Sequence, residues 1–314
     1  MTDRPLGLVV GAGGLLGSAV AAELHRQRSR ATVRPRFHWT EPDGFQQPFR
    51  DALDATVAEA RDQSRPWAVH WCAGVGHVGA SESELRAEDR LLKAAMDVIA
   101  TQTDRTKGLF CFASSAGAIY AASHDEVTDE STHPSPVSKY GEAKLRHEDL
   151  VRARLAAAGV QGRRLRISNI YGPGQRMAKP QGLLSHLVVN TLNRRPSTIY
   201  VPLDTSRDYL HTSSAARMMV ASGVAARVEG APADGLRILA AERSHSIAQI
   251  IGTLARVLRR RVPFVVVQRP ETRLQPLVLR FRSSDRTQHL LDTVTLEEGM
   301  ASIVGTARRQ MATG

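Results

Sequence analysis

Long apolar runs and cysteines are both scarce in this chain of 314 residues. No apolar run reaches about 18 residues, the length that crosses a bilayer, and the first residues show no signal-peptide pattern. The protein is therefore expected to be cytoplasmic and to have no membrane partner. The two cysteines, Cys72 and Cys111, fall in apolar segments, where a small buried thiol is expected and a disulfide is not.

Lysine is scarce as well, because almost all of the 42 basic residues are arginines, and these are scattered along the chain. The formal net charge of +11 would suit nucleic-acid binding. However, no basic run is interleaved with aromatic residues, and no helix-turn-helix, zinc-finger or RNA-binding pattern is present. We expect no nucleic-acid partner and interpret the surplus charge as attraction for an anionic small molecule. The histidines show no HxxxH or HExxH spacing, so no metal site is predicted.

Short apolar segments alternate with amphipathic ones through the first half of the chain. This alternation predicts an α/β fold, a Rossmann-type doubly wound parallel sheet with helices on both faces. The predicted strands are 6–10, 31–34, 67–72, 109–113 and 164–168, and the predicted helices are 18–24, 52–61, 85–100 and 140–158. Later in the chain, strands are predicted at 237–241 and 262–267, with a helix at 247–258.

The regular alternation ends after Gly172, where Gly172-Pro-Gly174 and Lys179-Pro-Gln-Gly182 interrupt the pattern. We expect a dinucleotide-binding Rossmann domain at 1–171 and a smaller, mainly substrate-binding domain at 172–314. The segment at about 205–245 is expected to return to the first domain.

A glycine-rich turn joins the first predicted strand to the first predicted helix. Glycines without a Cβ let the backbone approach a pyrophosphate, and the start of the helix offers free N–H groups to the anion. The turn therefore predicts a dinucleotide site. The cofactor contacts predicted here are Gly11, Gly13, Gly14, Leu15, Leu16 and Gly17.

The end of the second predicted strand bears on which dinucleotide binds. An acidic residue there favours NAD, whereas an arginine accommodates the 2′-phosphate of NADP. The chain offers Arg34-Pro-Arg36 and no acid, and guanidinium groups bind phosphate in a bidentate fashion. Arg34 and Arg36 therefore predict NADP in preference to NAD. The alternative is that they are two more surface arginines.

The segment Tyr140-Gly-Glu-Ala-Lys144 places a phenol and an ammonium group on one face of a helix. A tyrosine has a pKa of about 10, and proton transfer at neutral pH needs that value lowered by roughly 3 units. A lysine about 5 Å away supplies roughly 3 kcal/mol at an effective dielectric of about 20. The pair is predicted to be a tuned acid/base, although an isolated YxxxK pattern also occurs on solvated helix faces.

Taken together, these motifs resemble the extended short-chain dehydrogenase/reductase family of nucleotide-sugar epimerases, dehydratases and ketoreductases. The resemblance covers nearly the whole chain. Besides the glycine-rich turn and YGEAK, it rests on Ala73-Gly-Val-Gly-His-Val-Gly-Ala-Ser81, Ser114-Ser-Ala-Gly-Ala-Ile-Tyr120, Arg166-Ile-Ser-Asn-Ile-Tyr-Gly-Pro-Gly174, Arg207-Asp-Tyr-Leu-His211 and Thr295-Leu-Glu-Glu-Gly299.

The resemblance implies that Tyr140 exchanges a proton with the substrate oxygen and that Lys144 holds the nicotinamide ribose and lowers the tyrosine pKa. A hydroxyl after the strand at 109–113 would hydrogen-bond the substrate. The family often has this hydroxyl four places before the tyrosine of the block ending at Tyr120, but Ala116 stands there. We assign Ser115 instead, with Ser114 second; the alternative is that both serines cap the end of the strand.

The resemblance also implies binding residues. Asn169 and Arg207 are expected at the diphosphate of a nucleotide-linked substrate, although Arg207 could instead pair with Asp204 or Asp208. The remaining contacts implied are Ala73 and Gly74 for the cofactor, and Ser114, Lys179, Gln181 and Gly182 for the substrate.

Three reactions are compatible with this scaffold. Dehydration needs an Asp-Glu pair after the catalytic hydroxyl, and Ala116-Gly117-Ala118 supplies neither acid nor base. An epimerase of this kind generally has an acid after the second strand, which Arg34 and Arg36 replace. We therefore expect an NADPH-dependent ketoreductase acting on a nucleotide-linked sugar, with a 4-epimerase as the alternative and a non-catalytic NADP sensor as a third reading. By resemblance, a homodimer is expected through the helices at 85–100 and 140–158.

Overall fold

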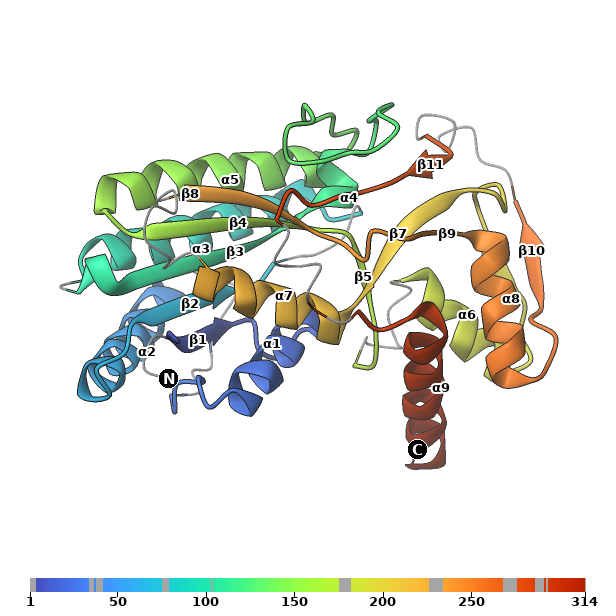
Figure 1. The fold of residues 1–314 in the computed structure, drawn as a ribbon, viewed down its shortest axis with the longest axis horizontal. Helices are drawn as coiled ribbons and strands as arrows, with labels where there is room; N and C mark the ends of the chain where they lie inside the picture. Colours follow the sequence, from blue (N-terminus) through green and yellow to red (C-terminus); the bar gives the residue numbers. More distant parts are fainter. Residues whose placement is uncertain are drawn as a thin grey trace.

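The computed structural model describes residues 4–33, 37, 42–74, 79–102, 104–174, 182–225, 234–267, 276–285, 291 and 293–313. Within these residues the chain forms a large parallel sheet with helices on both faces and a smaller lobe at its carboxyl-terminal side (Figure 1).

The large sheet confirms the predicted doubly wound α/β fold. Its strand order is β1-β2-β3-β4-β8, and every neighbouring pair is parallel. Strands β1 and β2 are buried along their whole length, as expected for a sheet covered on both faces. The strands are β1 (Leu6–Val10), β2 (Trp67–Trp71), β3 (Gly108–Ser115), β4 (Gln161–Ile167) and β8 (Asp234–Leu239).

Two apolar cores lie on opposite faces of this sheet. One joins the sheet to helices α2 (Pro42–Asp62), α3 (Glu82–Ala100) and α5 (Lys139–Ala158). The other joins it to α1 (Leu15–Arg26) and α7 (Thr212–Ala225). The contribution of α7 and β8 means that part of the chain beyond residue 205 packs in the large-sheet layer (Figure 1).

The helices that carry the site begin and end where local chemistry requires it. Ser81 forms a capping box with Glu84 at the start of α3, which satisfies two otherwise unpaired N–H groups. Ser138 accepts a hydrogen bond from the Gly141 N–H at the start of α5. Gly159 ends α5 in the left-handed conformation, at φ 67°. These caps fix the register of both helices along the sheet.

The smaller lobe has its own apolar core, built around Tyr171, Leu187, Ile250 and Met300. Its strands are β5 (Asn169–Tyr171), β6 (Ser197–Ile199), β7 (Ser206–His211), β9 (Ser244–Ser246), β10 (Phe264–Val266) and β11 (Val278–Leu279). Its helices are α6 (Leu183–Leu192), α8 (Ile247–Leu258) and α9 (Leu296–Thr313). Because β5 follows β4 after one residue, the small sheet starts at the carboxyl edge of the large one (Figure 1).

Two local predictions were wrong. In the described residues of 31–34, no strand forms, and an isolated bridge between Gly7 and Arg30 marks the place. The backbone N–H and the hydroxyl of Thr32 bond instead to the carboxylate of Glu59, at 2.9 and 2.8 Å. The helix predicted at 52–61 begins ten residues earlier, at Pro42, and continues through Pro48.

The longer α2 is explained by aromatic packing. Phe45 and Phe49 are fully buried, with their ring centroids 5.3 Å apart, and both rings meet the edge of Trp71. Burying an aromatic side chain stabilises the fold by roughly 2 kcal/mol or more, enough to offset much of the cost of a proline within a helix. Tertiary packing therefore overrides the local proline signal.

Candidate active site

Tyr140 and Lys144 lie on one face of α5, which is buried. Their side chains are 8% and 4% exposed, so the pair is not part of a solvated helix surface. The ammonium nitrogen of Lys144 lies 5.6 Å from the centre of the Tyr140 ring and 5.3 Å from that of Phe112. This spacing agrees with the separation expected for an i, i+4 pair and keeps the charge within reach of the phenol.

Gly141 lets the first turn of α5 pack closely against α4 (Ala116–Ile119). A Cβ at residue 141 would lie 2.5 Å from the carbonyl oxygen of Ala118 and 2.9 Å from Pro136. A side chain here would push α5 outward. The glycine therefore places Tyr140 beneath the carboxyl end of β3.

Ser115 is the serine that meets Tyr140. It ends β3 and caps α4, accepting a hydrogen bond from the Ala118 N–H at 3.3 Å. Its hydroxyl also lies close enough to the phenol of Tyr140 to lower the pKa of that group. Ser114 points elsewhere, donating to Oε1 of Glu148 at 2.6 Å inside the core. The structure thus places Ser115 beside Tyr140 and directs Ser114 away from it.

Glu88, on α3, is a site residue that the sequence reasoning missed. Its Oε1 lies 2.7 Å from Nζ of Lys144, and the two side chains are 5% and 4% exposed. His147 adds a third group, with its Nδ1 3.5 Å from the same oxygen. The signal was available, because Glu88 occupies the apolar face of a helix between Leu85 and Leu92.

The pKa of Tyr140 differs from the sequence-based expectation of a lowered value. Burial raises it, Lys144 lowers it, Glu88 raises it again, and the Ser115 hydrogen bond lowers it, leaving the pKa above its ordinary value. Burial alone would lower the pKa of Lys144, but the charge of Glu88 and the phenol outweigh burial and raise it. In this structure the resting pair is therefore a protonated phenol beside a charged ammonium.

A second buried ion pair supports the same region. Arg166, on β4, donates to both carboxylate oxygens of Glu148, at 2.8 to 3.2 Å, and also to the hydroxyl of Tyr120. Glu148 lies one turn beyond Lys144 on α5 and accepts from Ser114. This network ties α5 to the ends of β3 and β4, and so fixes the helix that carries the tyrosine.

The glycine-rich turn fits a dinucleotide pyrophosphate. Gly11 has φ 91°, and a Cβ at residue 17 would lie 2.1 Å from its carbonyl oxygen, so both positions require glycine. A Cβ at residue 13 would meet nothing within 4 Å, which leaves open space beside the turn. Gly14 is the N-cap of α1 and has no side chain to bond the first N–H groups, so a phosphate can accept from them.

The other predicted cofactor residues that the structure describes also lie at the carboxyl edge of the large sheet. Leu15 and Leu16 begin α1, and Ala73 and Gly74 follow β2 at the carboxyl edge of the sheet. A Cβ at residue 74 would lie 2.7 Å from the Glu88 carboxylate, so the turn after β2 packs directly against Glu88.

The predicted substrate contacts are only partly described. Asn169 donates to the backbone carbonyl of Asp208 at 2.9 Å, and its Oδ1 would lie 3.3 Å from a Cβ at residue 117. The Arg207 guanidinium donates to the carbonyls of Ser206 and Leu277. Gly182 directly precedes α6. Two of the predicted substrate residues, Lys179 and Gln181, and the two predicted cofactor residues Arg34 and Arg36 lie outside the described residues.

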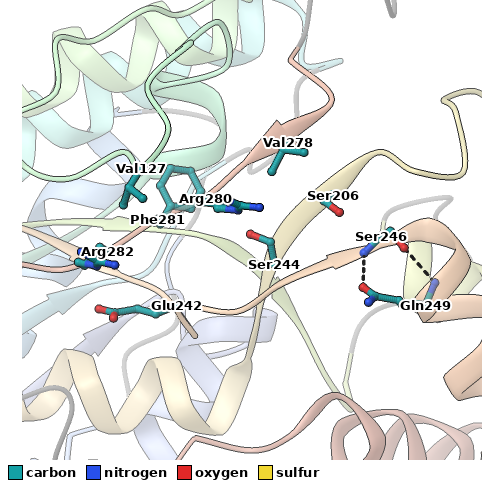
Figure 2. A pocket seen from close by; sticks show the side chains of 10 residues that line it. All are labelled: Val127, Ser206, Glu242, Ser244, Ser246, Gln249, Val278, Arg280, Phe281 and Arg282. Atoms are coloured by element: carbon teal, nitrogen blue, oxygen red, sulfur yellow. Dashed lines mark hydrogen bonds between the residues drawn. The ribbon is translucent and has the colours of Figure 1, made fainter.

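A pocket of about 390 Å³ opens on the small sheet (Figure 2). Tyr140, Lys144 and Ser115 are not among the residues that line it. Ser206 of β7 and its antiparallel partner Ser246 of β9 both line it. Successive strand residues point to opposite faces, so Arg207 lies on the other face of this ladder. The pocket is therefore not the diphosphate cleft predicted around Arg207.

These features define a class of protein: a Rossmann-type nucleotide-binding fold with a Ser-Tyr-Lys site at the carboxyl edge of its sheet. A sequence model of the NAD dependent epimerase/dehydratase family matches residues 7–231. The chain belongs to this family, within the extended short-chain dehydrogenases/reductases.

Curated relatives match over part of their length. A putative UDP-glucose 4-epimerase of Methanocaldococcus jannaschii is 28% identical over 106 residues, 34% of this chain and 35% of the relative. A dTDP-4-dehydro-6-deoxyglucose reductase of Escherichia coli is 32% identical over 111 residues, 35% of each chain. The aligned segments thus span about a third of these relatives.

Solved structures match the fold over nearly the whole chain. The UDP-glucose 4-epimerase of Thermotoga maritima, solved with UDP-glucose, has a TM-score of 0.76 at 19% identity and covers 97% of this chain and 99% of its own. The UDP-glucuronic acid 4-epimerase of Bacillus cereus, solved with UDP-glucuronic acid and NAD, has a TM-score of 0.73 at 17% identity, with the same coverage. None of the helices in the described part of the chain has the length and apolar character needed to cross a membrane.

Proposed function

We propose that this protein reduces a keto group on a nucleotide-linked sugar, with Tyr140 as the proton donor. The observation that carries the proposal is the state of Tyr140: its side chain is buried beside Lys144, and its pKa lies above the ordinary value of about 10. The phenol therefore keeps its proton at neutral pH, as a group that must protonate an alkoxide requires.

Each residue of the site has a distinct task in this reaction. When bound, the reduced nicotinamide supplies the hydride. Tyr140 gives its proton to the oxygen of the former carbonyl. Ser115, which lies beside the phenol, stabilises the charge that develops on that oxygen. The ammonium of Lys144 stabilises the phenolate that remains.

Dehydration is disfavoured by the residues that follow Ser115. The short helix Ala116–Ile119 has only aliphatic side chains or none, so no acid or base from this helix faces the substrate carbons. A 4-epimerase remains the alternative, supported by the names of several structural neighbours and of one curated relative. The reductase is supported by the name of another relative and by the protonated phenol.

For the cofactor, we propose NADPH on the basis of Arg34 and Arg36. The family description and the NAD bound in neighbouring structures support NAD as the alternative. For the substrate, we propose that Asn169 and Arg207, with Lys179, Gln181 and Gly182, contact the nucleotide diphosphate, which suits an amide donor and a guanidinium. We also propose a homodimer through α3 and α5. For the domains, we propose a dinucleotide-binding domain at 1–171, to which the segment at about 205–245 returns, and a mainly substrate-binding domain at 172–314.

Cofactor stoichiometry distinguishes the two reactions. Purified protein is incubated with NADPH or NADH and a panel of UDP- and dTDP-linked 4-keto sugars, and both cofactor absorbance and sugar products are followed. A reductase consumes one reduced cofactor per sugar reduced. The proposal fails if no keto sugar oxidises the cofactor while a UDP-hexose is converted to its C4 epimer without net cofactor consumption. Binding of the cofactor with neither reaction would support a sensor instead.

A further inference from the structure

The contact between Glu88 and Lys144 joins two helices that are far apart in the sequence. Glu88 comes from α3 and Lys144 from α5, and their 2.7 Å contact is almost completely shielded from water. A full carboxylate charge thus lies against the ammonium group that also faces Tyr140. A charge so close to ionisable groups and so poorly screened by water changes their ionisation, so the carboxylate affects both Lys144 and Tyr140.

We propose that Glu88 is a positioning residue that holds Lys144 charged and in place and keeps Tyr140 protonated until a substrate accepts the proton. The inference deepens the proposed function, on which it rests. Without a counter-charge, a buried lysine tends to lose its proton, and a charged lysine alone favours the phenolate. With Glu88 present, the two charges largely cancel at the phenol. The site then retains one transferable proton, located on Tyr140.

Glu88 also connects the tyrosine site to the turn predicted to face the cofactor. The position that a Cβ of Gly74 would occupy lies 2.7 to 3.2 Å from the Glu88 carboxylate. An alanine at residue 74 would therefore displace the carboxylate that holds Lys144. Glu88 is thus fixed from one side by the turn after β2 and from the other by α5.

Other ionisable groups surround the pair. His147 of α5 faces Glu88 as well, with its Nδ1 3.5 Å from Oε1. Asp89 of α3 contacts Nε2 of His147 and lies 3.6 Å from Arg146. Glu148 of α5 is paired with Arg166 of β4 and lies 3.6 Å from Arg164. The neighbouring groups on the remaining elements are Tyr120 at the end of α4, which accepts from Arg166, and the neutral hydroxyls of Ser114 and Ser115 on β3.

Charge-neutral substitution tests the proposal directly. In Glu88→Gln, the side chain keeps its size and an acceptor oxygen for Lys144 but loses the charge. Tyrosine ionisation is followed by ultraviolet difference absorbance in the protein without cofactor, with the corresponding Tyr140→Phe variant subtracted. Because Tyr140 and Lys144 titrate as a coupled pair, the pH profile of kcat/KM is measured as well. We expect both the phenolate signal and the Tyr140 limb of the profile to move to lower pH.

Asp89→Asn is the matched control, because it removes a neighbouring carboxylate of the same helix that pairs with His147 rather than Lys144. Asp89→Asn should move the phenolate signal and the pH profile of kcat/KM much less than Glu88→Gln does. A Glu88→Gln variant whose titrations coincide with those of Asp89→Asn overturns the proposal. If Glu88→Gln does not fold, Glu88→Asp takes its place, because it moves the carboxylate away from Lys144 by one methylene. It should shift both titrations in the same direction by a smaller amount. Unchanged titrations in Glu88→Asp would then overturn the proposal.

The direction of the kinetic limb separates this inference from the proposed function. A limb that falls as pH rises marks Tyr140 as the proton donor of a reductase, whereas a rising limb marks a base and contradicts the reductase. The displacement of either limb in Glu88→Gln tests the role of Glu88 alone. A rising limb that moves in Glu88→Gln therefore contradicts the reductase but supports the role of Glu88. A falling limb that does not move supports the reductase but contradicts the role of Glu88.

Discussion

The ammonium nitrogen of Lys144 lies 5.6 Å from the centre of the Tyr140 ring, one helical turn further along α5, and both side chains are buried. At that separation a lone cation would favour the phenolate by about 3 kcal/mol at an effective dielectric of about 20. The pKa of Tyr140 is nevertheless raised, because burial and Glu88 act against the lysine. The pair is thus arranged to keep a proton, which favours proton donation over proton abstraction.

The glycine-rich turn gives a matched pair of variants. Gly17→Ala places a methyl group 2.1 Å from the Gly11 carbonyl oxygen, so we expect the free energy of unfolding to fall by about 2 kcal/mol or more. Gly13→Ala meets nothing within 4 Å and should change stability by less than about 0.5 kcal/mol. Its methyl group would instead occupy the space assigned to the pyrophosphate and weaken dinucleotide binding roughly tenfold.

Urea denaturation and dinucleotide titration test these two variants together. A stable Gly13→Ala protein that binds the dinucleotide as tightly as wild type would contradict the placement of the pyrophosphate at this turn.

Buried and exposed ion pairs should respond very differently to removal of the arginine. Arg166→Ala leaves the carboxylate of Glu148 buried, with Ser114 and the more distant Arg164 still beside it, and should cost about 3 kcal/mol of unfolding free energy. The exposed pair of Arg154 and Asp97 joins the same helix α5 to α3 at 3.1 Å, with side chains 41% and 42% exposed.

Removing Arg154 is therefore the control for removing Arg166. Arg154→Ala should cost less than about 1 kcal/mol, because water screens the pair. Equal losses in the two variants, measured by chemical denaturation, would show that the Arg166 pair is not the support inferred here.

Asp208 should make stability depend on pH. Burial raises its pKa to about 6, against hydrogen bonds from Ser168 and from the Ala241 and Arg243 N–H groups that lower it. Between pH about 4 and 6 the folded protein binds a proton that the unfolded chain has released. The Asp208 contribution to stability therefore falls by up to about 3 kcal/mol as pH rises through this window, and then levels off.

Asp208→Asn should remove the pH dependence of stability that Asp208 causes, even if the substitution also changes overall stability. Urea denaturation at a series of pH values gives the difference between wild type and variant, which should decrease with pH across this window. A constant difference would show that Asp208 does not titrate as described.

The cofactor preference rests on Arg34 and Arg36 and is tested by replacing both with alanine. Loss of a charged contact to the 2′-phosphate costs about 2 kcal/mol, or roughly 30-fold in the Kd for NADPH, and should leave the Kd for NADH unchanged. If wild type binds NADH more tightly and the double variant alters neither Kd, the NADP assignment is wrong.

Periodicity alone predicted much of the sheet and its helices. The helix expected at 247–258 is α8, Ile247–Leu258, and the helix expected at 140–158 is α5, Lys139–Ala158. Both begin at a serine cap; α8 also has a strong apolar face, and α5 ends at a glycine. The strand expected at 31–34 had no comparable support. Whether a short β-branched segment joins a ladder depends on a partner far away, and here Glu59 bonds Thr32 instead.

The site residues likewise separate into those that local sequence could predict and those that depend on tertiary packing. Tyr140 and Lys144 could be paired from sequence because helical spacing alone places them together, and the choice of Ser115 over Ser114 agrees with the contacts observed. Glu88 could not be connected to Lys144 from sequence, because their contact depends on how α3 packs on α5, 56 residues further along the chain. The expected lowering of the tyrosine pKa was wrong for the same reason.

Turnover by Tyr140→Phe tests the central claim most directly. The substitution removes only the phenolic oxygen, which donates the proton in our account, and leaves the ring packed beside Lys144. We predict that dinucleotide binding stays within about twofold of wild type, while kcat for keto-sugar reduction falls by roughly a thousandfold or more. Reduction by Tyr140→Phe at the wild-type rate would contradict the account.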